Sequence, residues 1–154
     1  AAQYFPALPL NTIKMSTMGT AILDEYFGGV GWISSQDPET PIALHPWAVA
    51  GYAGMIINAL ELIPFGSTSG GRMALTLFGR RGMIFLGAAV WLVLLLTTLF
   101  GSTVDALLGA WVVYGLAQND VEVPARDEVE QVSAVRAVSA FLAWLVMLII
   151  LTPT

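Results

Sequence analysis

Long apolar stretches separated by short polar segments dominate the pattern of hydrophobic and polar positions along this chain. A helix needs about 20 apolar residues to cross a bilayer. Four stretches approach that length, namely Pro41 to Pro64, Met83 to Phe100, Thr103 to Ala117 and Ala134 to Leu151. The third is short and carries Asp105 near its start, which favours a shallow, tilted or re-entrant helix. The pattern predicts an all-α integral membrane protein with about four transmembrane helices, one of them short or re-entrant.

The first forty residues follow a different pattern. Prolines punctuate this segment, and residues 13 to 27 alternate apolar with small polar side chains. We expect an irregular interfacial segment that contains one amphipathic helix. The glycine-rich run from Phe27 to Trp32 is typical of a tight turn with Trp32 at the lipid headgroups, because the Gly-Lys-Ser/Thr of a phosphate loop does not follow it. Residues 1–40 are thus predicted to form an extramembrane segment, and residues 41–154 a transmembrane helical bundle.

The composition of the chain supports a membrane environment. Hydrophobic residues make up 56% and charged residues 11% of the sequence, with a mean hydropathy of +0.75. A soluble domain of this length does not tolerate that balance. The net charge of −5 is spread over short connecting segments, so no nucleic-acid partner is expected. The chain has no cysteine, which excludes disulfides, thiol nucleophiles and thiolate metal sites.

The arginines predict an orientation for the bundle. If all four helices span, one face receives the segments 64–82 and 118–133, with Arg72, Arg80, Arg81 and Arg126 in them and Arg136 next to them. The opposite face receives the N-terminal segment, whose one basic residue is Lys14. Lys and Arg concentrate on the cytoplasm-like side of a membrane. The arginine-rich loops are therefore expected on that side.

A polar, glycine-rich break follows the first apolar stretch. Residues 58–72 read N-A-L-E-L-I-P-F-G-S-T-S-G-G-R, and the pattern depends on Asn58, Pro64, Gly70, Gly71 and Arg72. It resembles the second signature of the site-2 protease family of intramembrane zinc peptidases, in which an Asp-Gly-Gly-Arg element breaks a helix. The sequences L-F-G-R-R at 77–81, T-P-I-A-L-H-P at 40–46 and P-A-R-D-E-V at 124–129 resemble the plastid branch of that family, the ethylene-dependent gravitropism-deficient and yellow-green type. The likeness covers blocks between residues 38 and 135.

The resemblance implies a zinc site that this chain does not reproduce. Ser69 stands where the family has its zinc-binding aspartate, and a serine hydroxyl is a poor zinc ligand beside a carboxylate. The family takes two histidines and a glutamate base from an H-E-x-x-H helix, whereas His45 is the single histidine here and precedes Pro46. We therefore expect no catalytic residues, no zinc and no enzymatic activity, with Ser69 as the former ligand position.

Three polar side chains are candidate pigment ligands. His45 lies near a predicted membrane boundary, where a neutral imidazole nitrogen could bind the magnesium of a chlorophyll. Asn58 and Glu61 share one helix face and could bind a metal, a pigment or Arg72. The alternatives are local hydrogen bonds at a helix start for His45 and structural hydrogen bonds or ion pairs for Asn58 and Glu61. A few chlorophyll or carotenoid molecules are thus candidate cofactors.

Three functions remain open at this point. The first, which we favour, is an inactive protease relative in the plastid thylakoid membrane, with stromal arginine loops, that acts as a structural or linker subunit of a photosystem with its antenna. Its partners would be lipids and other integral membrane subunits. The second is the C-terminal part of an active intramembrane zinc metalloprotease whose H-E-x-x-H segment lies upstream. The third, a dedicated light-harvesting protein, lacks the Glu-x-x-Asn/His-x-Arg pigment motif.

Overall fold

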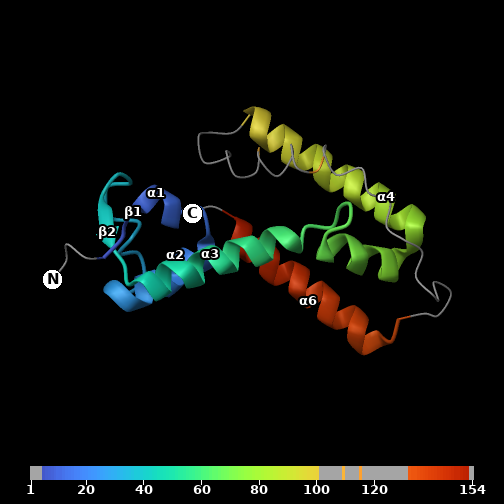
Figure 1. The fold of residues 1–154 in the computed structure, drawn as a ribbon, viewed down its shortest axis with the longest axis horizontal. Helices are drawn as coiled ribbons and strands as arrows, with labels where there is room; N and C mark the ends of the chain where they lie inside the picture. The colour runs from blue at the N-terminus through green and yellow to red at the C-terminus, as the bar shows by residue number, and fades with distance from the viewer. Residues whose placement is uncertain (1–4, 101–108, 110–114, 116–131, 153–154) are drawn as a thin grey trace. The chain divides into compact units, whose positions relative to one another are not determined.

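The computed structural model describes residues 5–100, 109, 115 and 132–152, which divide into two compact units. The first unit comprises Ala1–Ala59 and Leu148–Thr154, and the second Leu60–Met147. The elements, labelled in Figure 1, are β1 (Ala7–Pro9), α1 (Leu10–Ile13), α2 (Thr17–Phe27), β2 (Pro41–Ala43), α3 (Pro46–Glu61), α4 (Ser69–Phe100) and α6 (Ala134–Leu151). The chain is mostly helical, as predicted. The predicted transmembrane segment Thr103 to Ala117 lies almost wholly outside the described residues. The prediction of about four transmembrane helices is therefore not confirmed.

The N-terminal segment is a folded unit with a core of its own, where an irregular segment was expected. Strands β1 and β2 pair antiparallel, with Leu8 opposite Ile42. The core of this unit consists of five buried side chains, those of Leu10, Ile13, Ile33, Ile42 and Leu44. The hydropathy pattern did not reveal the strands because each has three residues, too few to show a two-residue period.

Helix α2 lies in the segment where one amphipathic helix was predicted, and the residues that it buries are Gly19, Thr20 and Asp24. The Ser16 hydroxyl accepts a hydrogen bond from the Gly19 amide at 3.0 Å and so caps the helix start. In the last turn of the helix, the buried Asp24 carboxylate accepts the amides of Gly31 at 2.9 Å and Ile33 at 2.7 Å, both beyond the helix end. The glycine-rich run is therefore a tight turn, as predicted, and Asp24 holds its backbone in place.

Helix α3 packs directly on α2 within the first unit (Figure 1). A Cβ at Gly19 would overlap the Tyr52 ring and lie 3.3 Å from the Met55 methyl group, so glycine permits this approach. The Tyr52 hydroxyl donates to the carbonyl of Thr12 at 2.7 Å, and burial raises the Tyr52 pKa to about 12. This packing fixes α3 against the N-terminal segment.

The first predicted span is shorter than expected. Residues 41–43 form β2, and α3 begins at Pro46, where proline is favoured as the first helical residue and disfavours helix for the residue before it. Helix α3 has 16 residues, which gives roughly 24 Å against the roughly 30 Å of a bilayer core. The prediction of one spanning helix from Pro41 to Pro64 is therefore wrong at its start.

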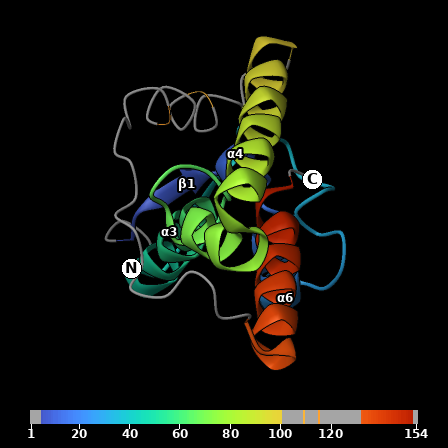
Figure 2. The ribbon, with the colours of Figure 1, turned by 90° about the vertical axis from the view of Figure 1, so that its right-hand side faces the viewer.

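Helix α4 begins earlier than the predicted span and bends. It contains the stretch Met83 to Phe100, but it starts at Ser69, inside the segment that was expected to be a loop. Gly79 has φ 69° and ψ −179°, which is not helical, and the ribbon changes direction there (Figure 2). Glycine tolerates this backbone, whereas other residues rarely do. Arg72 therefore lies on the short helical part before the bend, and Arg80 and Arg81 follow the bend directly.

Helices α4 and α6 are the two described helices that are long and apolar enough to cross a membrane. The bounds of α6 match the predicted stretch Ala134 to Leu151. In their most apolar windows, 6% of residues in α4 and 11% in α6 are buried within the protein. The core helix of a soluble domain would be mostly buried, so these apolar surfaces indicate a lipid environment.

Candidate functional site: a glycine-rich helix break

The candidate site is the turn between α3 and α4, at residues 62–71. Two of its apolar side chains are buried, with Ile63 2% and Phe65 5% exposed. The Phe65 amide donates to the Ile63 carbonyl at 2.9 Å, which tightens the chain immediately after Pro64. The sequence thus folds here into a compact turn and not into an extended loop.

The Thr68 side chain ties this turn to the start of α4. Its hydroxyl lies 2.7 Å from the carbonyls of both Ile63 and Phe65 and accepts the Gly71 amide at 3.0 Å. The Arg72 amide donates to the Thr68 carbonyl at 3.0 Å, so Thr68 is the N-cap of α4. Since Thr68 is 2% exposed, these groups have little access to solvent. One hydroxyl therefore satisfies polar backbone groups on both sides of the break.

Gly70 and Gly71 let the first turn of α4 lie against the backbone of the break. A Cβ at Gly70 would overlap the Leu62 carbonyl group and lie 2.8 Å from the carbonyl carbon of Ile63. A Cβ at Gly71 would overlap the Gly66 oxygen and lie 2.9 Å from the Phe65 oxygen. Backbone atoms cannot move aside as a flexible side chain can. The Gly-Gly pair is therefore required by close backbone approach.

Ser69 and Arg72 lie on the outer side of this turn. Ser69 is the first residue of α4 and is exposed, as is Arg72 one turn later. A side chain at position 69 is thus exposed and does not take part in the buried turn. The structure separates two roles at the break: Thr68 stabilises it, and Ser69 presents a side chain from it.

His45 caps the start of α3. Its Nδ1 accepts the Trp47 amide at 3.3 Å, and its carbonyl accepts the Ala48 amide at 2.8 Å. The Phe5 ring lies 5.6 Å from the His45 ring. When Nδ1 accepts a hydrogen bond, the neutral ring carries its proton on Nε2 and offers no lone pair there to a metal. His45 thus makes the local hydrogen bonds at a helix start that were considered as the alternative to pigment binding. Binding of a pigment metal by Nδ1 would require the hydrogen bond to the Trp47 amide to break.

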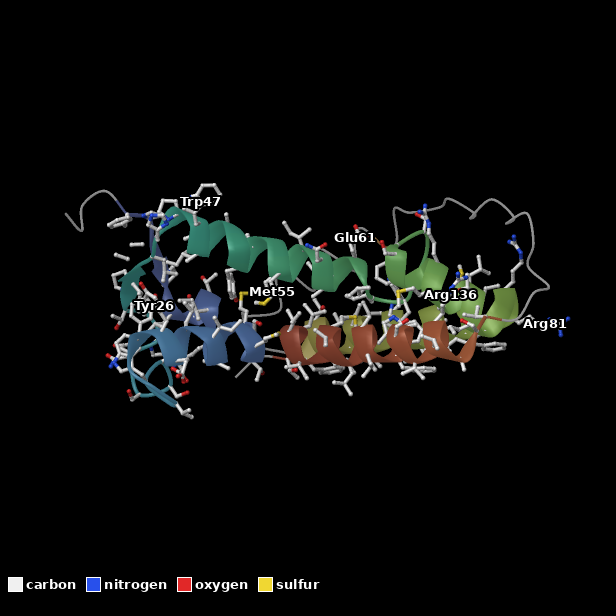
Figure 3. All side chains as sticks on the ribbon, turned by 90° about the horizontal axis from the view of Figure 1, so that it is seen from below. Tyr26, Trp47, Met55, Glu61, Arg81 and Arg136 are labelled. Atoms are coloured by element: carbon white, nitrogen blue, oxygen red, sulfur yellow. The ribbon has the colours of Figure 1, made fainter. Side chains whose placement is uncertain are left out.

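Asn58 and Glu61 lie near the end of α3, far along the helix from the Trp47 end (Figure 3). The Asn58 amide group donates to the Gly54 carbonyl at 2.7 Å, within its own helix. Glu61, half-buried, is the last residue of α3. The structural hydrogen bond expected for Asn58 is thus present. A pigment on either side chain stays a prediction.

The described residues do not provide the donor set of a catalytic zinc site. Within the described ranges, no three His, Asp or Glu side chains come together. Such a site uses about three protein ligands, and His45 is the single imidazole of the chain. A zinc ion at this break would need ligands from beyond the described residues, so no step of a reaction is derived through it.

Two important residues escaped the sequence analysis, Thr68 and Asp24. Thr68 had only part of a signal, because Thr is favoured as an N-cap but the start of α4 after it was not predicted. Asp24 had a weaker signal, an acidic residue at a helix end followed by several glycines. The hydropathy pattern of the helix shows Asp24 only as one polar position among others. It could not reveal that the Asp24 carboxylate is buried and accepts two amides.

Comparison with known proteins gives a partial match to plastid metalloproteases. The chain is 34% identical over 89 residues to the probable zinc metalloprotease EGY3, chloroplastic, of Oryza sativa subsp. indica, covering 57% of this chain and 15% of the relative. It is 33% identical over 91 residues to the probable zinc metallopeptidase EGY3, chloroplastic, of Arabidopsis thaliana, 59% of this chain and 16% of the relative. It is 29% identical over 92 residues to the probable zinc metalloprotease EGY1, chloroplastic, of Arabidopsis thaliana, with the same coverage. No family model matches. No solved structure matches.

These names correct one conclusion of the sequence analysis. The chain was expected not to be an enzyme because Ser69 replaces an aspartate, yet its relatives are named as probable zinc metalloproteases. The chain spans about 15% of the length of these relatives, so a missing motif within it does not establish a loss of activity. The names likewise give no support to a photosystem subunit. The chain is similar, over more than half its length, to chloroplastic probable zinc metalloproteases of the site-2 protease family, which confirms the resemblance predicted from its glycine-rich break.

Proposed function

We propose that these 154 residues form the helix-break part of an intramembrane zinc metalloprotease of the plastid. The single observation that carries this proposal is the construction of the break, where Gly70 and Gly71 admit close backbone contact next to a membrane helix. The similarity to chloroplastic zinc metalloproteases supports it. The histidine ligands and the glutamate base would come from an upstream part of the protein.

In this proposal the helix break lies within the membrane, and its polar backbone groups lie near the site where the substrate peptide is cleaved. Non-helical backbone is tolerated at that depth where protein encloses it or where it lines a polar cavity. Thr68 satisfies the inner carbonyls, and Ser69 projects outward from the helix start. In this proposal Thr68 is a positioning residue, and the outward face at Ser69 faces the helix that carries the ligands.

We place the protein in the plastid membrane, with the thylakoid as the finer proposal. The apolar surfaces of α4 and α6 and the chloroplastic relatives support a plastid membrane protein. We further propose that the arginines near the Gly79 bend face the stroma, following the rule that positive side chains concentrate on the inner side. Protease added to intact thylakoids should then cleave near Arg80. Protection there with cleavage near Lys14 would reverse this orientation.

A linker role in a photosynthetic complex stays a prediction, as does pigment binding. No relative's name supports either. Native gels in mild detergent test the linker role: migration with a pigment–protein complex would favour it, and migration apart from all chlorophyll would count against it.

The test of the proposed function is cleavage of a transmembrane peptide by the natural gene product purified from its membranes. We expect cleavage that a zinc chelator stops. Gly71→Ala should reduce it about tenfold or more, because the added Cβ would overlap the Gly66 oxygen and lie 2.9 Å from the Phe65 oxygen. Gly51→Ala is the matched control, since a Cβ there meets no atom within 4 Å, and it should leave cleavage unchanged.

Two outcomes of the cleavage experiment would contradict the proposed function or the role of the break. Natural protein that is folded, loaded with zinc salt and still unable to cleave any membrane peptide would refute the proposal. Equal loss of cleavage in the Gly71 and Gly51 variants would show that the break has no particular role. Circular dichroism of each variant separates loss of function from loss of helix.

A further inference from the structure

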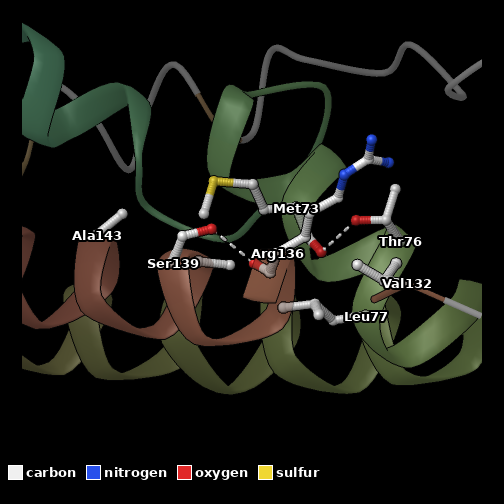
Figure 4. Close-up of a pocket in the computed structure, with 8 residues that line it drawn as sticks. Met73, Thr76, Leu77, Val132, Arg136, Ser139 and Ala143 are labelled. Carbon is white, nitrogen blue, oxygen red and sulfur yellow. Dashed lines mark hydrogen bonds between the residues drawn. The ribbon is translucent and has the colours of Figure 1, made fainter. Parts of the chain in front are cut away.

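A groove of about 440 Å³ lies between the first part of α4 and the first half of α6, within the second unit (Figure 4). Its apolar walls come from Met73, Leu77, Val132, Ala140 and Ala143. The volume falls within the roughly 300 to 1,000 Å³ typical of sites for small molecules. The metalloprotease proposal makes no use of this groove.

The polar lining of the groove contains one charge. Of the residues that line it in the described part of the chain, Arg136 carries the charge, and its side chain reaches toward the α4 wall beside Thr76 (Figure 4). The Thr76 hydroxyl donates to the Met73 carbonyl at 2.9 Å, and the Ser139 hydroxyl to the Arg136 carbonyl at 2.8 Å. Both hydroxyls thus bond within their own helices. The groove therefore offers a cation and an apolar channel.

The position of Arg136 along its helix fits a lipid headgroup. It is the third residue of α6, an apolar helix of 18 residues that is long enough to span. A guanidinium at the end of such a helix reaches the interface, where lipid headgroups lie. Apolar residues of the same groove come from the next two turns of α6, toward the middle of the span.

Among the described residues that line the groove, Arg136 is the charged one, and a guanidinium there favours an anion. Arginine binds phosphate and similar oxyanions through paired N–H groups. Basic pockets between membrane helices bind anionic lipid headgroups by this means.

We propose that the groove binds one anionic glycerolipid, with its headgroup at Arg136 and an acyl chain along the walls formed by Met73, Leu77 and Ala143. A zwitterionic lipid offers no net charge to Arg136 and should bind more weakly. An acidic side chain that paired with Arg136 would exclude the headgroup, and equal retention of the two lipids would then be observed.

The experiment measures lipid retention by native mass spectrometry of the purified protein, with phosphatidylglycerol and phosphatidylcholine as probes. We expect the protein to retain one phosphatidylglycerol in preference to phosphatidylcholine. Arg136→Gln should lower phosphatidylglycerol retention by tenfold or more, the usual effect of losing a charged hydrogen bond. Ala143→Leu should lower retention of both lipids by filling the apolar wall.

Arg81→Gln is the control, because it removes the same charge outside the groove and should leave retention unchanged. Circular dichroism and gel filtration establish that each variant is folded. Equal retention of the two lipids, an Arg136→Gln protein that binds as well as the unmodified one, or an equal effect of Arg81→Gln would each overturn the proposal. If Arg136→Gln does not fold, Ala143→Leu decides: unchanged retention would overturn the assignment of the groove.

Discussion

Replacing the Thr68 hydroxyl tests how the helix break is held together. Thr68→Val keeps the shape of the side chain but removes the group that lies 2.7 Å from the Ile63 and Phe65 carbonyls and accepts the Gly71 amide at 3.0 Å. Loss of an N-cap costs about 1 kcal/mol. A buried carbonyl left without its donor costs about 1 to 3 kcal/mol more. We therefore expect Thr68→Val to lower the free energy of unfolding by about 2 to 4 kcal/mol.

Thr68→Ser is the matched variant, since it keeps the hydroxyl and loses one methyl group, worth about 0.8 kcal/mol. Ser69→Ala, at the exposed neighbouring position, should change stability by less than about 0.5 kcal/mol. Unfolding is followed by circular dichroism in mixed micelles with increasing denaturing detergent. If the valine protein were as stable as the serine protein, burial and not hydrogen bonding would hold the turn, and this reasoning would be refuted.

Three other changes test separate features. Gly70→Ala should destabilise the protein by more than 2 kcal/mol, because its Cβ overlaps the Leu62 carbonyl, whereas Gly51→Ala should be neutral or slightly stabilising; equal melting of the two proteins would contradict this. Asp24→Asn should cost about 1 to 3 kcal/mol and speed amide exchange in the glycine turn, since Asp24 accepts two amides there; unchanged exchange would speak against that role. Burial raises the Tyr52 pKa to about 12, from about 10 in the unfolded chain. The contribution of the neutral Tyr52 side chain to the free energy of unfolding should therefore be complete below about pH 10 and fall between about pH 10 and pH 12. Tyr52→Phe should remove this fall, and an unchanged pH dependence in that variant would contradict the explanation.

The sequence predicted those parts of the fold that depend on long apolar repeats. Helix α6 has the predicted bounds, and the stretch Met83 to Phe100 lies in α4, because 18 or more apolar residues leave a chain few alternatives in a membrane. The pairing of β1 with β2 was missed. Three-residue strands have no measurable period, and their pairing depends on contacts between residues more than thirty positions apart.

The candidate site was predicted from its motif, but its construction was not. The glycines at 70 and 71 were recognised as part of a helix break, and the structure gives the physical reason, contact with the carbonyl groups before them. The start of α4 at Ser69 was missed because the pattern of arginines and glycines resembles a loop. Helix propensities alone could not predict that the buried Thr68 hydroxyl caps α4, because the fold of residues 62–68 places that hydroxyl next to the Gly71 amide.

The most direct measurement of the central claim is the zinc content of the natural protein isolated from its plastid membrane, taken together with chelator-sensitive cleavage of a transmembrane peptide. A helix break that serves a metalloprotease predicts about one zinc per protein molecule and cleavage that stops when the zinc is removed. Intact, folded protein that contains no zinc and cleaves no peptide after zinc is supplied would contradict the claim.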